Sequence, residues 1–563
     1  MIEEIKKIIN NKKIDGFLIS KNDKYFTEYS NTSNLELISN FSGSAGFALI
    51  LKDKNYLFVD GRYTLQAKKQ SGKKFIILEI PYFWPKNLFS KIKKQINIGF
   101  DPNLFTYNTL HKYFENTCNL IPLNTNLFKN KKKIKKKKSF FYLDDKIVGE
   151  SSKSKINRVL KFIKKKGIDN LFVSAGENVC WLLNIRGKDL PNSPVANCRL
   201  ILSRNKRIYF FSSKNKTLNI RKRFKNLNLS FHKENEIFEI LSSIKNNNFC
   251  IDAQTCSVFY EELINSQFNI ISRYDPIYNF KSIKNKIEIK NMVNSHIEDG
   301  VALTKFLYWI KNNQLKNLDE KNIETKLEKF RKKNKNYLYP SFATIAGSGP
   351  NGAIIHYRST VSSNRKLKRN DILLVDSGGQ YKWGTTDVTR TVCFSNVSKK
   401  IKDIFTRVLK GHIAVVLSDI NKELTGHNID KKARKSLNSI GLDYRHGTGH
   451  GVGFFLNVHE GPQSISKNNK IKLIEGMIVS NEPGFYLENN FGIRIENLVF
   501  IKKNRNKLFF KNLTLAPIDK DLINYKMLSK IEKDYLFKYH LEVYSKISPF
   551  LSIKEKKWLA KLI

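Results

Sequence analysis

Carboxylate side chains inside apolar strand patterns are the sequence feature that most constrains how this chain can fold. In "DILLVDSGGQYKWGTTDVTRTVCF", an apolar run stops at Asp376, and an alternating run holds Asp387 among threonines. The glycine-rich stretch between the runs favours a turn, so we predict a β-hairpin. If this turn is centred near Tyr381 and Lys382, the aspartates lie directly opposite each other, where like charges are destabilising. Either a cation lies between them, or the turn is off-centre and one aspartate faces solvent.

A second acidic pair follows further along the chain. "GMIVSNEPGFYL" is typical of a strand that ends at Glu482, because Pro483 and Gly484 stop regular pairing. In "FGIRIENLVFI", strict alternation places Arg494 and Glu496 on the face opposite the isoleucines. A buried carboxylate is costly unless it is paired or bound to a metal, so all four carboxylates require a common explanation.

Two divalent cations would account for all four carboxylates. Carboxylates are hard oxygen ligands that can bridge a pair of cations, and one added imidazole favours manganese, iron, cobalt or zinc over calcium. Two such ions about 3.5–4 Å apart can hold a hydroxide and polarise a carbonyl. The pattern therefore predicts a hydrolase.

The stretch "HGTGHGVGFFLNVHEGP" (446–462) holds three of the ten histidines. A phosphate-binding loop would follow a strand and open a helix, whereas this stretch continues into large apolar residues and lacks the lysine and hydroxyl of such a loop. Histidines with a purely structural role remain the alternative. His450, between two glycines that let the backbone approach a site, is the best ligand candidate, and His446 and His459 would line the substrate cavity.

The first half of the chain contains a faint internal repeat. "KIDGFLIS" (13–20) is echoed by "GIDNLFVS" (167–174), and "NYLFVD" (55–60) is echoed by "RIYFFS" (207–212). Each copy begins with a lysine-rich helical pattern, so each is predicted to be an α/β unit with a central sheet. Chance similarity between short apolar strings is the alternative.

These patterns predict three regions: 1–138, 139–284 and 285–563, the last with a helical extension over about 512–563. The basic block "KNKKKIKKKK" (129–138) marks the first boundary. Near 285 a long helix begins, with one apolar stripe formed by Ile289, Val293, Ile297 and Val301. Residues 520–563 are typical of two amphipathic helices, which either cover a core or form a dimer contact.

The charge is strongly positive, with 100 Lys and Arg against 50 Asp and Glu, which suggests nucleic acid or an anionic membrane. However, lysine, isoleucine and asparagine are over-used everywhere, which favours compositional bias over a charged face interleaved with aromatics. The block at 129–138 is typical of a solvated linker. We therefore expect neither nucleic acid nor a membrane as a partner.

The remaining features indicate a cytoplasmic protein. The start "MIEEIKKIINNKKIDG" lacks an apolar run, so we expect no secretory leader, and no stretch of about 18 apolar residues occurs. The six cysteines are scattered and form no C-x-x-C pair, which suits a reducing compartment.

With these residues in place, the chain resembles the aminopeptidase P (Xaa-Pro aminopeptidase) family of pita-bread metallopeptidases, in its three-domain cytosolic type. The matching strings also include "FVDGRYTLQA" (58–67), "WLLNIRG" (181–187) and "LTLAPID" (513–519), so the resemblance spans nearly the whole chain. The strings that carry the chemistry are "GSGPNGAIIHYRS" (347–359), "DSGGQYKWGTTDVTRT" (376–391), "LDYRHGTGHGVGFFLNVHEGP" (442–462), "GMIVSNEPGFY" (476–486) and "GIRIEN" (492–497).

The resemblance implies an α/β (α+β) fold, with two creatinase-like N-terminal α/β domains followed by a pita-bread catalytic domain. It also implies a homodimer and two manganese ions, with zinc, cobalt or iron as alternatives. By motif, Asp376 would be a bidentate ligand of one ion, Asp387 and Glu496 would bridge both, and His450 and Glu482 would complete the second.

In this family a hydroxide that bridges the metals attacks the carbonyl of the first residue of a peptide whose second residue is proline. By resemblance, His356 would hold the substrate and guide protons, His459 would stabilise the oxyanion, and Glu482 would shuttle a proton.

The proline ring would enter a pocket formed by His446, Tyr486 and Arg494, unless the last two only support the metal ligands. A prolidase, which cleaves only dipeptides, is the near alternative, and the three-domain length argues against it. A non-enzymatic pita-bread protein that binds nucleic acid is the more distant alternative, and the five intact ligand positions argue against it.

Overall fold

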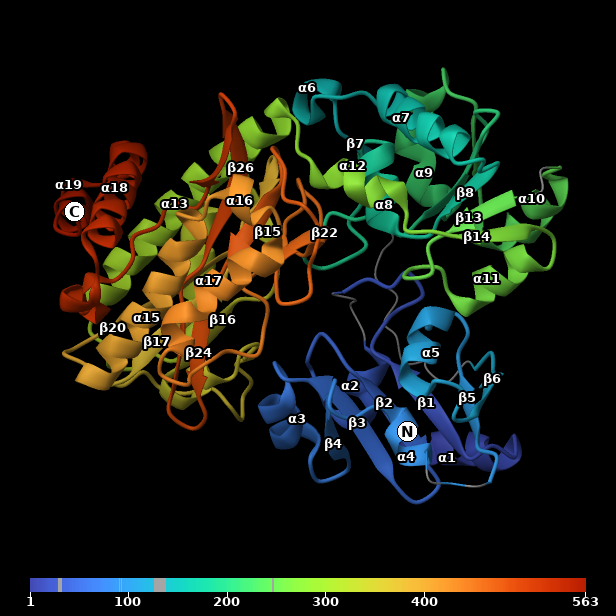
Figure 1. Ribbon diagram of the computed structural model, residues 1–563, viewed down its shortest axis with the longest axis horizontal. Helices are drawn as coiled ribbons and strands as arrows, with labels where there is room; N and C mark the ends of the chain where they lie inside the picture. The colour runs from blue at the N-terminus through green and yellow to red at the C-terminus, as the bar shows by residue number, and fades with distance from the viewer. Residues whose placement is uncertain (29–32, 91, 93, 126–137, 246–247) are drawn as a thin grey trace. The chain divides into compact units, whose positions relative to one another are not determined.

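The computed structural model describes residues 1–28, 33–90, 92, 94–125, 138–245 and 248–563, which divide into two compact units, Met1–Ile277 and Tyr278–Ile563 (Figure 1). The predicted basic block at 129–138 lies outside the described residues except for Lys138. Among the helices of the described ranges, none is both long and apolar enough to cross a bilayer.

Unit 1 contains, within its described residues, two six-stranded sheets. The first is formed by β1 (Gly16–Ser20), β2 (Phe47–Leu51), β3 (Asn55–Asp60), β4 (Ile76–Ile80), β5 (Asn97–Phe100) and β6 (Asn119–Pro122). The second is formed by β8 (Asn170–Val173), β10 (Arg199–Ser203), β11 (Ile208–Phe211), β12 (Leu229–His232), β13 (Asn248–Ile251) and β14 (Asn269–Ser272).

The two sheets have the same topology. Their strand orders are β4-β3-β2-β1-β5-β6 and β12-β11-β10-β8-β13-β14. In the first, β1–β2 and β2–β3 are antiparallel, and the other three pairings, β3–β4, β1–β5 and β5–β6, are parallel. The second repeats this pattern pair by pair. The echoed strings thus lie on matching strands, β1 with β8 and β3 with β11, which confirms the tandem repeat.

Each copy begins with an amphipathic helix. α1 (Ile2–Asn11) buries Ile5 and Ile9, and α7 (Ser152–Lys165) buries a stripe at helical spacing that includes Ile156 and Val159. The other elements of this unit are short: α2 (Asn34–Ser39), α3 (Thr64–Ser71), α4 (Pro85–Phe89), α5 (Tyr107–Phe114), β7 (Phe141–Tyr142), α6 (Asp145–Val148), α8 (Gly176–Leu182), β9 (Ile185–Arg186), α9 (Lys214–Arg221), α10 (Ile237–Ser243) and α11 (Val258–Asn265).

Unit 2 places two pairs of helices against two sheets, after α12 (Pro276–Ser282) leads into it. In its first half, α13 (Lys286–Asn312) and α14 (Glu320–Lys332) pack on β16 (Ile345–Ser348), β17 (Ile372–Ser377) and β20 (Val388–Cys393). In its second half, α15 (Lys399–Val416) and α17 (Gly426–Asn438), with α16 (Ile420–Glu423) between them, pack on a five-stranded sheet. That sheet consists of β22 (Glu460–Ile465), β21 (Gly449–Gly451), β23 (Ile478–Asn481), β26 (Asn497–Asn504) and β27 (Lys507–Asn512).

The hairpin over 372–393 forms, but its centre lies one residue further along than predicted. The turn is at Lys382 and Trp383, between β18 (Gly379–Tyr381) and β19 (Gly384–Thr385), and β18 also pairs with β15 (Tyr337–Pro340). Asp376 is therefore opposite Thr389, and the predicted direct opposition of Asp376 and Asp387 is wrong. A shift of two residues preserves the face of a strand, so the two aspartates are diagonal neighbours. Both are buried, with 8% and 4% exposure, which excludes the solvent-facing alternative.

The long helix predicted near 285 is α13, but its most buried face differs from the predicted stripe. Ile289, Val293, Ile297 and Val301 are only half-buried. The fully buried face lies one residue earlier and carries polar groups, among them Ser295, His296 and Asp299.

The tail forms the two predicted helices, α18 (Lys530–Ile547) and α19 (Ile553–Ala560). Leu536, Val543 and Leu559 are buried in a core shared with α15 and with β24 (Gly484–Leu487) and β25 (Phe491–Arg494). The tail therefore covers a core, and its part in a dimer contact stays a prediction.

Candidate active site

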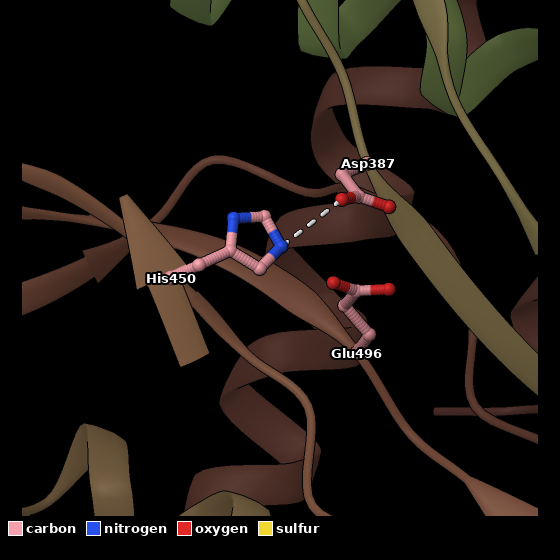
Figure 2. Close-up of side chains that lie close together, drawn as sticks. All are labelled: Asp387, His450 and Glu496. Carbon is pink, nitrogen blue, oxygen red and sulfur yellow. Dashed lines mark ion pairs between the residues drawn. The ribbon is translucent and has the colours of Figure 1, made fainter. Parts of the chain in front are cut away.

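Asp387, His450 and Glu496 converge in unit 2 from three separate segments (Figure 2). Asp387 directly precedes β20, His450 is the central residue of β21, and Glu496 lies between β25 and β26. One ligand atom from each lies within 4.8 Å of the others, and His450 Nε2 is 3.4 Å from Asp387 Oδ2. Three of the five predicted ligands thus form one cluster with the donor set of a metal site.

Glu482 joins this cluster from the end of β23. Its Oε1 lies 3.5 Å from His450 Nε2, and its Oε2 lies 4.0 Å from His446 Nδ1. The Ser480 hydroxyl accepts from the backbone N–H of His450 and donates to Glu482 Oε1, so it joins the two predicted ligands. The strand ends at Asn481, one residue before the predicted end at Glu482, and Gly484 does not stop pairing, because β24 begins there.

Asp376, at the buried end of β17, is held from one side by an arginine. Arg494 Nη2 donates to Asp376 Oδ2 over 2.6 Å. The other oxygen, Oδ1, is buried and has no hydrogen-bond partner among the described residues. A buried carboxylate oxygen without a donor is costly, and a cation would satisfy it.

The electrostatics of the cluster show an excess of negative charge. Burial raises the pKa of Asp376 to about 6, although Arg494 opposes this shift. Burial, together with Asp387 and the other carboxylates, raises the pKa of Glu496 well above its usual range. Burial lowers the pKa of His450, but the hydrogen bond to Asp387 and the charge of Glu482 outweigh it and raise this pKa to about 9. A cation among these groups would favour the ionised form of the carboxylates.

The residues present fit divalent metal ions. Four buried or half-buried carboxylates supply hard oxygen donors, among them the Oδ1 of Asp376 that is unbonded within the described residues, and one imidazole adds a nitrogen. Such a mixed set suits manganese, iron, cobalt or zinc.

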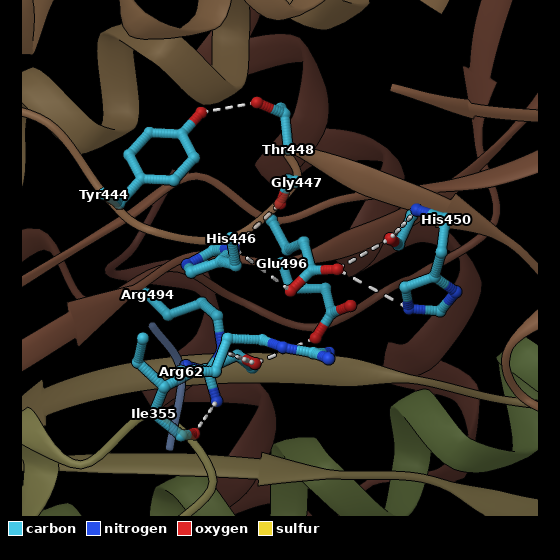
Figure 3. A network of polar contacts seen from close by, with 12 residues as sticks. Arg62, Ile355, Tyr444, His446, Gly447, Thr448, His450, Arg494 and Glu496 are labelled. Carbon is cyan, nitrogen blue, oxygen red and sulfur yellow. Dashed lines mark hydrogen bonds and ion pairs between the residues drawn. The ribbon is translucent and has the colours of Figure 1, made fainter. Parts of the chain in front are cut away.

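The three predicted substrate residues form one hydrogen-bonded row, and two of them, His446 and Arg494, are labelled in Figure 3. His446 Nε2 is 2.9 Å from the hydroxyl of Tyr486, and Arg494 Nη1 donates to that hydroxyl over 2.6 Å. Because Arg494 also binds Asp376, it has a supporting role towards a predicted ligand whatever else it contacts.

His459 and His356 lie in different segments. The ring of His459 is 4.2 Å from that of His450, centroid to centroid, and nearly perpendicular to it. His356 is half-buried in the loop that follows a short 3-10 helix at Gly349–Ala353. The carbonyl of the preceding residue, Ile355, accepts from Arg494 Nη2 over 3.4 Å. His459 is thus placed beside the cluster, whereas the residue before His356 is linked to it through Arg494.

Sequence reasoning missed the hydroxyls that bond to the predicted ligands or to the segments that carry them. Thr389 Oγ1 donates to Glu496 Oε2 over 2.8 Å and accepts from Arg494 Nε over 3.1 Å. Thr448 Oγ1 donates to Asp430 over 2.6 Å, and the Thr448 carbonyl accepts from the N–H of Glu482. The signal available in the sequence was the strand alternation that places Thr389 on the face of Asp387.

Comparison with known proteins decides the family. The family model described as metallopeptidase family M24 matches residues 290–503, and that of its C-terminal region matches 506–562. Two models of the creatinase/prolidase N-terminal domain match 1–127 and 130–288. The chain is 34% identical to Xaa-Pro aminopeptidase 1 of Dictyostelium discoideum, over all of this chain and 96% of that protein.

The chain belongs to the Xaa-Pro aminopeptidases of metallopeptidase family M24. Among solved structures of such aminopeptidases, it is similar to the X-prolyl aminopeptidase of Caenorhabditis elegans, described as a cytosolic enzyme with a di-nuclear active site, with a TM-score of 0.90, 30% identity and coverage of 98% and 95% of the two chains. The prolidase of Pyrococcus horikoshii, with a TM-score of 0.54 and 25% identity, is covered to 99% but matches only 65% of this chain. The expected fold of two creatinase-like domains and a pita-bread domain is confirmed.

Proposed function

We propose that this chain hydrolyses the bond between the first residue of a peptide and a proline at position two, with two divalent cations. The convergence of Asp387, His450 and Glu496, with Glu482 and Asp376 beside them, is the observation that carries this proposal. The full-length similarity to Xaa-Pro aminopeptidases supports the substrate class.

The proposed ligand set is Asp376 on one cation, His450 and Glu482 on the other, and Asp387 and Glu496 shared by both. We expect manganese, with zinc, cobalt or iron as alternatives. When bound, the pair of ions supplies an activated water and polarises the scissile carbonyl.

The neighbouring side chains then handle the substrate and its protons. His459, beside His450, is in a position to donate a hydrogen bond to the carbonyl oxygen as negative charge develops on it. Glu482, whose burial and neighbouring carboxylates raise its pKa despite the charge of His450, can pass a proton to the leaving nitrogen. His356 is proposed to hold the substrate and guide protons.

Selectivity for proline is proposed to come from His446, Tyr486 and Arg494. The nitrogen of a proline within a peptide carries no N–H, so a site that accepts a hydrogen bond from this amide gains no affinity for proline. A pocket that fits the ring does gain affinity. The row of hydrogen bonds through Tyr486 fixes the orientation of all three side chains before the substrate binds.

We further infer a homodimer in the cytoplasm. Ile531, Phe537 and Ile553 on the tail helices are 67%, 51% and 72% exposed, which supports a contact with a second copy. The cytosolic description of the Caenorhabditis elegans enzyme supports the location.

The proposal is tested with an Xaa-Pro-Yaa peptide, purified protein and manganese. We expect release of the first residue, loss of this activity in Asp376→Asn, and retention in Asp371→Asn, a matched control whose carboxylate also pairs with an arginine, Arg365. Normal turnover by Asp376→Asn would defeat the ligand assignment. A comparison of Gly-Pro with Gly-Pro-Pro separates this activity from that of a prolidase, which cleaves only the dipeptide.

A further inference from the structure

A buried ion pair lies behind the hairpin that carries Asp376 and Asp387. Asp299 of α13 and Arg331 of α14 are 2% and 1% exposed, and Arg331 Nε donates to Asp299 Oδ1 over 2.7 Å. Arg331 Nη2 also donates to Asp299 Oδ2, over 3.3 Å. Neither residue belongs to the metal cluster or to the substrate row.

Three further hydrogen bonds join this pair to the hairpin. Arg331 Nη2 donates to the hydroxyl of Ser377 over 3.0 Å. The hydroxyls of Thr386 and Tyr381 donate to the two oxygens of Asp299, each over 2.8 Å. Ser377 directly follows Asp376, Thr386 directly precedes Asp387, and Tyr381 stands beside the turn between them.

We propose that Asp299 and Arg331 are a positioning pair that fixes the spacing of Asp376 and Asp387, so that both carboxylates reach the cations at the same time. This inference rests on the proposed function. The pair, which comes from two helices, bonds to both arms of the hairpin and to the residue beside its turn. A displacement of either arm would therefore break a charge-assisted hydrogen bond.

Stability alone does not require this arrangement. A buried ion pair is often no more stabilising than apolar residues of the same volume, whereas its fixed directions make it suitable for orientation. Residues that orient metal ligands typically contribute about 10–100-fold to metal affinity or activity. Through its bonds to the hydroxyls of Ser377 and Thr386, the pair fixes the positions of the adjacent proposed ligands, Asp376 and Asp387.

The test uses the full-length protein and measures manganese binding by titration and the rise in Tm on adding manganese. Thr386→Val removes the contact next to the shared ligand Asp387, and we expect both manganese affinities to fall about 10–100-fold. Ser377→Ala removes the contact next to Asp376, and we expect only one affinity to fall. Thr386→Ser keeps the hydroxyl and should restore wild-type binding.

Thr304→Val is the matched control, because Thr304 is buried on α13 and its hydroxyl has no partner among the described groups. It should leave both affinities unchanged. A merely structural role would lower the Tm of metal-free and metal-loaded protein equally. If the pair has a positioning role, the rise in Tm on adding manganese becomes smaller. This rise can be measured in Thr386→Val and Ser377→Ala, which each remove one hydroxyl, even if Asp299→Asn does not fold.

Unchanged affinities in Thr386→Val and Ser377→Ala, while the wild type binds two ions and cleaves an Xaa-Pro peptide, would overturn the positioning role alone. A wild type that binds no manganese would overturn this inference together with the proposed function.

Discussion

Each half of unit 2 carries a buried Asp–Arg pair that bonds to a segment of the candidate metal cluster, but the two pairs are built differently. In the first half, Asp299 and Arg331 come from two helices. In the second half, Asp430 and Arg434 lie one turn apart on α17, with Arg434 Nε 2.8 Å from Asp430 Oδ2.

The partners of the two pairs differ as well. The first pair bonds to side chains next to Asp376 and Asp387, the two proposed carboxylate ligands. Asp430 accepts from Thr448, two residues before His450, and Arg434 donates to the carbonyls of Tyr444 and His446. On the proposal made above, the first half sets the distance between two proposed anionic ligands, and the second half sets the path of the loop that carries His446 and His450.

The largest effect is expected from the first half, in Asp387→Asn. Because Asp387 is proposed to bind both cations, the substitution removes a negatively charged ligand from each of them. We expect peptide hydrolysis to fall more than the roughly 10–100-fold typical of residues that only orient ligands. Metal content after dialysis, measured beside kcat/KM, checks this, and full metal occupancy with normal turnover would contradict it.

His459→Gln in the second half should produce a different kind of loss. His459 lies beside the cluster without being a proposed ligand, so both cations stay bound while kcat falls about 10²–10³-fold, as for other oxyanion donors. Steady-state kinetics and metal analysis on one preparation separate the two halves. Loss of metal in this variant would move His459 into the ligand set.

A smaller effect is expected from Asp430→Asn than from Asp299→Asn. Arg434 keeps Asp443 as a second carboxylate partner, and only one ligand-bearing loop depends on the pair. We expect manganese affinity to fall less than about tenfold, against about 10–100-fold for Asp299→Asn. Manganese titration ranks the two variants, and equal losses would show that the pairs do the same work.

The smallest effect concerns the buried histidines on the helices of the two halves, His296 on α13 and His412 on α15. Burial lowers the pKa of His412 to about 3 and also lowers that of His296. From about pH 6.5 down to the folded-state pKa, the folded protein binds fewer protons than the unfolded chain, so stability falls as pH falls.

Urea unfolding of metal-free protein at several pH values between 7.5 and 4.5 measures this dependence. His412→Gln can still donate to the carbonyl of Asn481, which His412 Nδ1 contacts at 3.1 Å. We expect the variant to lose less stability in acid than the wild type, by up to about 1.4 kcal/mol per pH unit. His296→Gln is the first-half counterpart, and identical pH slopes in wild type and both variants would contradict the neutral, buried state of these rings.

Much of the cluster was predictable, because a carboxylate at the end of an apolar run is conspicuous. Asp376 and Glu482 stand out in this way, Glu496 stands out by strand alternation, and His450 stands out between glycines. The hairpin centre was not predictable, because "GGQYKWG" contains no Asn-Gly or Asp-Gly pair at its turn to fix the central residues. An error of one residue in the hairpin centre shifted the cross-strand partner of Asp376 by two residues, but Asp376 and Asp387 stayed on the same face of the sheet.

The supporting pairs were beyond sequence reasoning for a different reason. Asp299 and Asp430 stand in helices of a chain in which 27% of residues are charged, so periodicity alone does not show which charges are buried. The similarity of the two sheets of unit 1, in contrast, followed from the repeat, because two copies of one pattern fold to one topology, although the strand order itself was not predicted.

Direct titration of metal-free protein with manganese tests the central claim, that five side chains from separate segments hold one pair of cations. The account predicts two equivalents bound per chain in the wild type and loss of both in the combined Asp387→Asn, Glu496→Gln variant. Binding of fewer than two equivalents by the wild type, or undiminished binding by this variant, would contradict it.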